Sequence, residues 1–111
     1  MSILLKYMGG VMASKGEVLE ALKKVIDPEI GLNIVDLGLV YQVEVQDEKA
    51  EVEFTLTSPG CPLGGMITND IQHVVREETG IQDVEPKLVW DPPWSVEFMS
   101  EEAKLHLGLP I

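Results

Sequence analysis

Hydrophobic and polar residues alternate along two neighbouring stretches of the chain, residues 39–46 and 50–57. A short polar segment, residues 47–49, separates them. A period of two on both sides of a short polar loop predicts an antiparallel β-hairpin, with one face toward the core and the other toward water. By this alternation Thr55 and Thr57 lie on the wet face.

A helical period precedes the hairpin. Ser14 and Glu17 have the spacing of a capping box, in which each side chain bonds to the other residue's backbone amide. Apolar residues then recur at helical spacing as far as Ile26, and Asp27-Pro28 is expected to end the helix because a residue before proline avoids the α region.

A second helix is predicted over residues 62–79, with Pro62 at its first position and Gly80 as its stop. Residues 84–90 follow as a strand, which Pro86 favours at the edge of a sheet. Strand, helix and strand in this order predict that the last strand lies parallel to its neighbour in the sheet.

The end of the chain contains two more expected elements. Trp94, Val96 and Phe98 alternate, which indicates a short strand or extended segment. Ser100 is expected to cap a last short helix, and Gly108 to stop it.

Together these elements predict a two-layer α/β (α+β) single domain. An antiparallel hairpin and a parallel crossover strand form a small mixed sheet, accompanied by two main helices and a short C-terminal helix. Residues 1–13 are expected to be a flexible leader, with the domain over residues 14–111; the leader lacks the basic region of a signal peptide. No uncharged apolar run is long enough to span a membrane, so no membrane partner is expected.

The net charge of −11 argues against a nucleic-acid partner, because neutralising phosphates requires clustered Lys and Arg. The single cysteine cannot form an internal disulfide. A reducing compartment, the cytoplasm, therefore fits best.

The segment 27–38 is rich in turn residues and yet largely apolar, so we expect it to pack on the core. It carries three acids, Asp27, Glu29 and Asp36. Taken alone, the segment favours a structural interpretation: Asp27 caps a turn, Glu29 is solvated, and Asp36 holds the loop by accepting backbone amides.

Cys61 stands at a turn just before Pro62, where it would cap the second helix. The positive end of that helix is expected to lower the pKa of the thiol and make the sulfur a better ligand or nucleophile. The alternative is a buried cysteine that acts as a small hydrophobe. Nucleophilic catalysis normally needs a nearby base, and His73 is roughly 18 Å away along the helix. A thiol enzyme is therefore a poor fit, although an acidic residue could serve as the base, and we predict that the protein is not an enzyme.

One cysteine is too few for a closed zinc site or a complete cluster cage. A partial set remains: Cys61 with Asp27 or Glu29, or two Cys61 residues across a homodimer. Such an open site suits transient handling of iron or of a cluster.

Several motifs, in order, carry a family resemblance: residues 27–29 (DPE), 33–40 (NIVDLGLV), 56–62 (LTSPGCP), 90–94 (WDPPW), 100–103 (SEEA) and 107–108 (LG). With them the sequence resembles the small metal–sulfur (iron–sulfur) cluster assembly factor family. That family includes SufT-type proteins, the PaaD subunit of phenylacetyl-CoA oxygenation systems, and cytosolic iron–sulfur assembly proteins of eukaryotes.

The resemblance implies a compact α/β domain that acts in iron–sulfur protein maturation, as a transient carrier or an adaptor for cluster delivery. It marks Asp27, Glu29, Thr57 and Cys61 as a shared site, with Cys61, Asp27 and Glu29 as candidate ligands. The implied cargo is a transient iron–sulfur cluster or iron, with no tightly bound cofactor. The implied partners are the assembly machinery and client apoproteins. The alternative is an interaction module, or an accessory subunit of a PaaD-like oxygenase system, without its own metal site.

Overall fold

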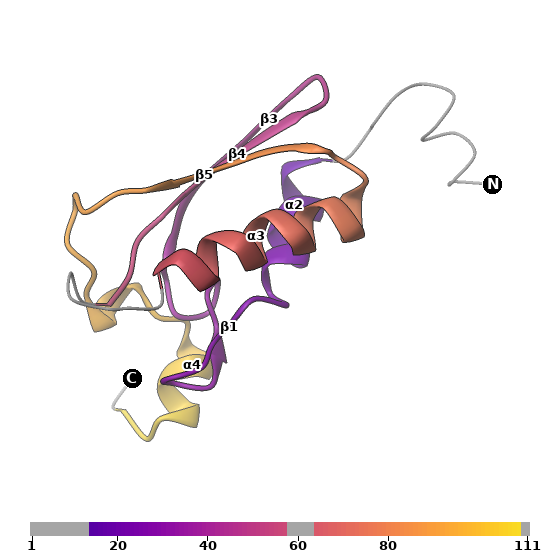
Figure 1. The fold of residues 1–111 in the computed structure, drawn as a ribbon. Helices are drawn as coiled ribbons and strands as arrows, with labels where there is room; N and C mark the ends of the chain where they lie inside the picture. The colour runs from indigo at the N-terminus through magenta and orange to yellow at the C-terminus, as the bar shows by residue number, and fades with distance from the viewer. Residues whose placement is uncertain (1–13, 58–63, 110–111) are drawn as a thin grey trace.

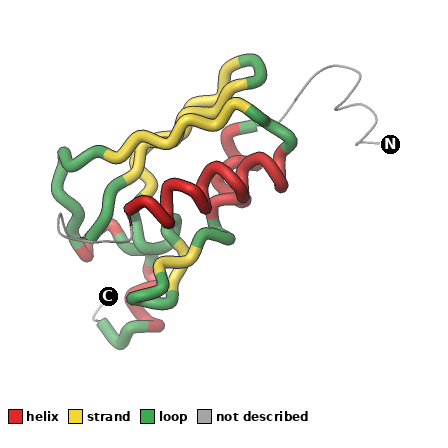
Figure 2. Tube along the Cα trace, in the orientation of Figure 1, coloured by secondary structure: helices red, strands yellow, loops and turns green. Residues whose placement is uncertain are grey.

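The computed structural model describes residues 14–57 and 64–109. Its main sheet has three strands in the order β3-β4-β5, formed by Val40–Gln46, Lys49–Phe54 and Asp83–Leu88. Helices α2 (Lys15–Leu22) and α3 (Gly64–Thr79) both lie on one face of this sheet (Figures 1 and 2). The predicted two-layer α+β arrangement is confirmed.

Strands β3 and β4 pair antiparallel, with Val43 opposite Val52 and a register shift between Val40 and Gln42. Strand β5 pairs parallel to β4 and forms an edge of the sheet, as its proline favours. The hairpin, the crossover and the edge position of β5 are thus as predicted.

The alternation of burial along β4 ends with the strand. Ala50, Val52 and Phe54 are buried, but Thr55 and Leu56 are then buried consecutively. The prediction that Thr55 lies on the wet face is therefore wrong. The backbone amide of Thr55 bonds to the carbonyl of Leu39, one residue before β3 begins. Beyond the strand a period of two no longer separates a wet face from a dry one.

Helix α2 begins as predicted but ends early. Both hydrogen bonds of the Ser14–Glu17 capping box are present. The helix ends at Leu22, four residues before the expected Ile26, which instead forms the two-residue strand β1 (Ile26–Asp27). Strand β1 pairs with β2 (Leu32–Asn33). The amides at 23–25 bond three residues back, and this tighter turn releases the chain into the extended conformation favoured before Pro28.

Helix α3 ends at Thr79, as predicted, and Gly80 follows with a φ of 83° and an amide bonded to the carbonyl of Arg76. The apolar residues on its inner face pack into a core shared with α2 and the sheet. The largest fully buried side chains are Phe54, Leu22, Ile34, Leu37, Leu39, Ile67, Ile71, Ile81, Val18, Val25, Val52 and Val75. Among the described residues, no helix is both long and apolar enough to cross a bilayer.

Residues 89–100, here called the strap, run on past the end of β5, turn, and lead into the last helix (Figure 1). Val96–Phe98 form the 3₁₀ turn η1, so the predicted extended segment is wrong there. The Ser95 hydroxyl accepts from the amide of Glu97, and this local bond favours a turn over a strand. Helix α4 (Glu101–His106) follows with the predicted Ser100 cap.

Candidate functional site

The turn after β1 is built around Asp27. Its side chain is 3% exposed, and Oδ1 accepts a hydrogen bond from the amide of Glu29 at 2.9 Å. Its carbonyl accepts from the amides of Ile30 and Gly31, the latter with a φ of 82°. The predicted turn-capping role of Asp27 is confirmed, and the exposed side chain of Glu29 is solvated as expected. Asp27 thus fixes the backbone that carries Glu29.

The second half of the loop is braced by a reciprocal pair. The Asn33 side-chain amide donates to Asp36 Oδ2 at 2.8 Å, and the Asp36 amide donates to Asn33 Oδ1 at 2.9 Å. The acceptor role of Asp36 is confirmed, but its partner is a side-chain amide rather than the predicted backbone amides. Two of the three acids of this loop therefore hold its shape.

The strap locks the loop from the other side. Trp94 Nε1 donates to the carbonyl of Leu37 at 2.7 Å, and the amide of Ser100 donates to the carbonyl of Asp36 at 2.8 Å. Gly38 has a φ of 76°, and a Cβ there would lie 2.6 Å from the carbonyl carbon of Phe98. Only glycine allows the two backbones to approach this closely.

The remaining predicted site residues lie beyond β4. Thr57 is half-buried, three residues after the strand ends, and Cys61 lies outside the described residues. Asp27 and Glu29 are held together by one turn. Their proximity to Thr57 and Cys61 stays a prediction.

Sequence reasoning missed Thr55. Its side chain is 0% exposed, and its hydroxyl has no hydrogen-bond partner among the described residues. A buried hydroxyl without a partner carries a desolvation cost. Alternation of polar and apolar residues predicts exposure only within the strand, and Thr55 lies just beyond it, so the pattern assigned Thr55 to the wrong face.

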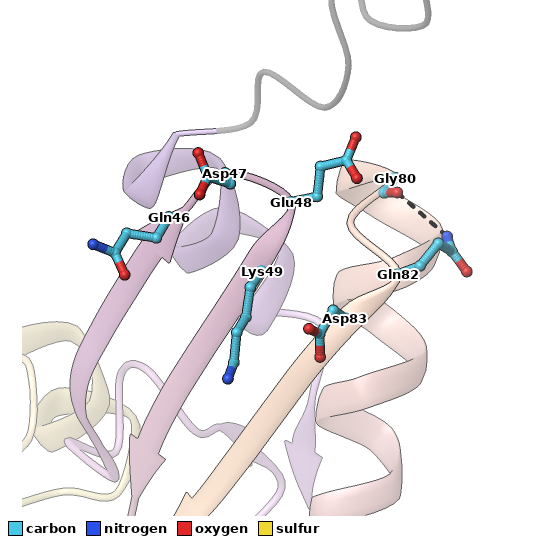
Figure 3. A pocket seen from close by; sticks show the side chains of 7 residues that line it. All are labelled: Gln46, Asp47, Glu48, Lys49, Gly80, Gln82 and Asp83. Atoms are coloured by element: carbon cyan, nitrogen blue, oxygen red, sulfur yellow. Dashed lines mark hydrogen bonds between the residues drawn. The ribbon is translucent and has the colours of Figure 1, made fainter.

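A hollow of about 510 Å³ lies at the hairpin turn, bounded by residues 46–49 and by Gly80, Gln82 and Asp83 (Figure 3). Gln82 Nε2 donates to the carbonyl of Gly80 at its rim. The hollow lies at the Gln46–Lys49 end of the sheet, whereas the predicted thiol loop follows the Phe54 end. It is therefore not the site that the sequence predicts.

The outer face of the sheet carries a ladder of exposed ion pairs. Lys49 pairs with Glu85 at 2.8 Å and Lys87 with Glu51 at 2.7 Å. The hydrogen bond from Lys49 lowers the pKa of Glu85, and the same bond raises the pKa of Lys49. These contacts stabilise the exposed face only weakly.

Within residues 14–57 and 64–109, no three His, Cys, Asp or Glu side chains gather closely enough to hold a metal ion. What this part of the chain provides is a doubly braced loop that presents the exposed side chain of Glu29.

Comparisons with known proteins identify the class to which this fold and loop belong. The model of the family described as "Iron-sulfur cluster assembly protein" matches residues 15–85. The chain belongs to the iron–sulfur cluster assembly protein family, as its motifs predict.

Among its relatives is the Fe-S protein maturation auxiliary factor SufT of Staphylococcus aureus (strain USA300), which is 51% identical over 77% of this chain and 98% of the relative. The Fe-S protein maturation auxiliary factor YitW of Bacillus subtilis (strain 168) is 41% identical over 87% of this chain and 96% of the relative. A crystal structure of a domain of unknown function from Bacillus anthracis superposes with a TM-score of 0.84 at 39% identity, covering 93% of this chain and 99% of that one.

Proposed function

We propose that this protein is an iron–sulfur maturation factor that helps to deliver a cluster, as cargo, to client apoproteins without catalysing a reaction itself. The observation that carries this proposal is the family match over residues 15–85, which includes both the Asp27 turn and the cysteine turn. Two relatives that are matched along almost their whole length are named as auxiliary factors of the same process.

The two acids of the Asp27 turn receive different roles. Asp27 is almost fully buried, and one carboxylate oxygen already caps the turn. Glu29 is exposed, so its carboxylate can reach a ligand without breaking the loop. We therefore assign Asp27 to positioning, and Glu29 to assisting the Cys61 thiolate when it contacts iron or a cluster.

Thiolate is the ligand that iron–sulfur clusters use most, and carboxylate is a weaker companion. A site with one thiolate and one carboxylate would hold its cargo loosely and release it to a client with more cysteines. A thiol in this role must stay reduced, which fits the cytoplasm. Two Cys61 residues in a homodimer would offer a second arrangement, separable by measuring the mass of the loaded protein.

The proposal is tested by anaerobic incubation of the purified protein with iron and sulfide. The wild type should develop a thiolate-to-iron absorption band, Cys61→Ala should lose it, and Glu29→Gln should release its iron faster to a chelator. Asp27→Asn keeps the capping oxygen and serves as the matched control, with release close to wild type.

A second assay separates a carrier from an adaptor. The loaded protein is mixed with a purified apo iron–sulfur enzyme whose activity returns on cluster insertion. Faster reactivation by wild type than by Cys61→Ala supports the carrier. A band that survives in Cys61→Ala, or equal reactivation by both proteins, overturns the assigned role of the thiol.

A further inference from the structure

Aromatic side chains are unevenly distributed in this chain. The structure describes five of them, and four lie on the strap or on the strand beside it: Tyr41, Trp90, Trp94 and Phe98. Phe54 alone among the five is fully buried in the core. Most of the described aromatic side chains therefore lie at one end of the sheet.

Three of these side chains, Tyr41, Trp94 and Phe98, are held in place by contacts. The rings of Tyr41 and Phe98 meet edge to face, with centroids 5.8 Å apart. The Tyr41 hydroxyl donates to the carbonyl of Pro92 at 2.8 Å, and Trp94 is anchored to Leu37. A surface fixed in this way loses little entropy when it binds a partner.

Three side chains of the strap are largely open to solvent, whereas Tyr41 is half-buried. Trp90 is 43% exposed, Val96 47% and Phe98 42%. With Tyr41 they form what we call the aromatic surface. Neighbouring exposed apolar side chains mark interaction sites, and Trp and Tyr are enriched among the residues that dominate binding energy.

The charged residues of the strap itself have one sign. The strap, residues 89–100, contains Asp91 and Glu97 but no Lys or Arg. Asp91 acts directly on the aromatic surface: burial raises the pKa of Tyr41, and the Asp91 charge raises it further. The aromatic surface therefore has the Asp91 charge acting on Tyr41 and Glu97 between Val96 and Phe98.

This charge selects among the partners that an apolar surface can have. A second copy related by twofold symmetry would bring the same acids face to face. Nucleic acid and anionic membrane would be repelled for the same reason. A segment with Lys or Arg beside an apolar anchor would satisfy both features, since its cations can also lie over the aromatic rings.

We infer that the aromatic surface of Tyr41, Trp90, Val96 and Phe98 docks a segment of a partner protein in which an aromatic or aliphatic anchor is flanked by Lys or Arg. This inference needs neither Cys61 nor bound iron. It therefore stands or falls separately from the proposed role in cluster delivery.

The test uses nitrogen-15-labelled protein without iron and three synthetic peptides. One peptide carries Phe and Leu flanked by Arg, the second has Glu in place of each Arg, and the third has Ser in place of each apolar residue. We expect the first peptide to shift the Trp90 indole and the Tyr41, Val96 and Phe98 amides. It should bind at least about tenfold more tightly than the other two, and less tightly as salt is added.

Trp90→Ala should weaken binding of the first peptide about tenfold or more. Asp91→Asn should reduce both the affinity and its salt dependence. Leu105→Ala is the matched control, because Leu105 is 62% exposed but lies on α4, outside the aromatic surface. Thermal unfolding of each variant checks that the fold is retained.

Equal binding of the Arg and Glu peptides, or shifts that map elsewhere, would overturn the inference. An equal loss of affinity in Leu105→Ala would do the same. A wild-type dimer that Trp90→Ala converts to a monomer would instead assign the aromatic surface to a second copy of the chain.

Discussion

Two regions join distant parts of this chain by polar contacts of nearly equal length. At the junction between the loop 34–38 and the strap, the Trp94 indole and the Ser100 amide donate to backbone carbonyls at 2.7 and 2.8 Å. On the outer face of the sheet, two lysines meet glutamates at 2.8 and 2.7 Å. At the junction Leu37 is fully buried and Asp36, Trp94 and Ser100 are half-buried, whereas the ladder leaves its side chains about a third to a half exposed.

This difference in burial shows that donor–acceptor distance alone does not determine how much each contact contributes to the free energy of unfolding. Water competes for every charge of the ladder, so each pair contributes little. At the junction the alternative to each bond is a poorly solvated carbonyl or amide, so each loss is costly. Substitutions at the junction should therefore unfold the protein far more readily than substitutions on the ladder.

The largest effect is expected at Gly38. Gly38→Ala requires a left-handed backbone at an alanine and pushes a methyl group into the Phe98 backbone. We expect a loss of more than about 3 kcal/mol in the free energy of unfolding, measured by urea denaturation.

Gly31→Ala is the matched control for Gly38→Ala. Gly31 has a similar φ of 82°, but a Cβ there would meet nothing within 4 Å. It should cost only about 1 kcal/mol, the backbone term alone. Equal losses in the two variants would show that the strap does not hold the loop.

The contact of Gly38 with the strap also shows which parts of the fold the sequence could not predict. Periodicity and caps predicted the hairpin, α3 and the Ser14 and Ser100 caps, because these depend on residues close in sequence. The parallel pairing of β5 followed from the order strand, helix, strand. The junction joins residues about 60 positions apart, so no local pattern announces it.

In the candidate site, too, local features could be predicted from the sequence and long-range packing could not. The turn-capping role of Asp27 followed from its Asp-Pro-Glu context, which is local. The burial of Thr55 depends on which segments cover the sheet beyond Phe54, and the early end of α2 depends on pairing of β1 with β2. The first is a tertiary effect, and the second is a local pairing after the helix; each overrides a periodic pattern.

The next effect is expected at Asp27, which shapes the same loop from its other end. Asp27→Ala leaves the buried turn without its cap and should cost about 1–2 kcal/mol. Asp27→Asn retains an oxygen for the Glu29 amide and should recover most of that loss. Paired urea titrations measure both, and an Asn variant as unstable as the Ala variant would show that charge, not the cap, matters here.

Thr55 is expected to give a change of opposite sign. Thr55→Val replaces a buried hydroxyl without a described partner by a methyl group, and should raise the free energy of unfolding by up to about 1 kcal/mol. Calorimetry of the purified variants would measure the change as a higher Tm.

Thr79→Val is the matched control for that substitution. The Thr79 hydroxyl donates to the carbonyl of Val75 at 2.6 Å and accepts from the amide of Ile81 at 3.2 Å. The same chemical change there should destabilise the protein by about 1–2 kcal/mol. Destabilisation at Thr55 as well would indicate that its hydroxyl has a partner in solution.

The smallest effect is expected on the ladder. Because the hydrogen bond from Lys49 lowers the pKa of Glu85, this pair stabilises the fold above the ordinary glutamate pKa of about 4.3 and loses that contribution as the pH falls through the lowered value. The raised pKa of Lys49 means that the contribution persists until the pH rises through that higher value. Glu85→Gln should therefore lower Tm slightly at neutral pH and low salt, and the difference should vanish in about 0.5 M NaCl or once the pH falls below the lowered pKa of Glu85. A Glu85→Gln loss that survives salt and equals the loss in Asp27→Ala would contradict the ranking, because exposed pairs would then match buried ones.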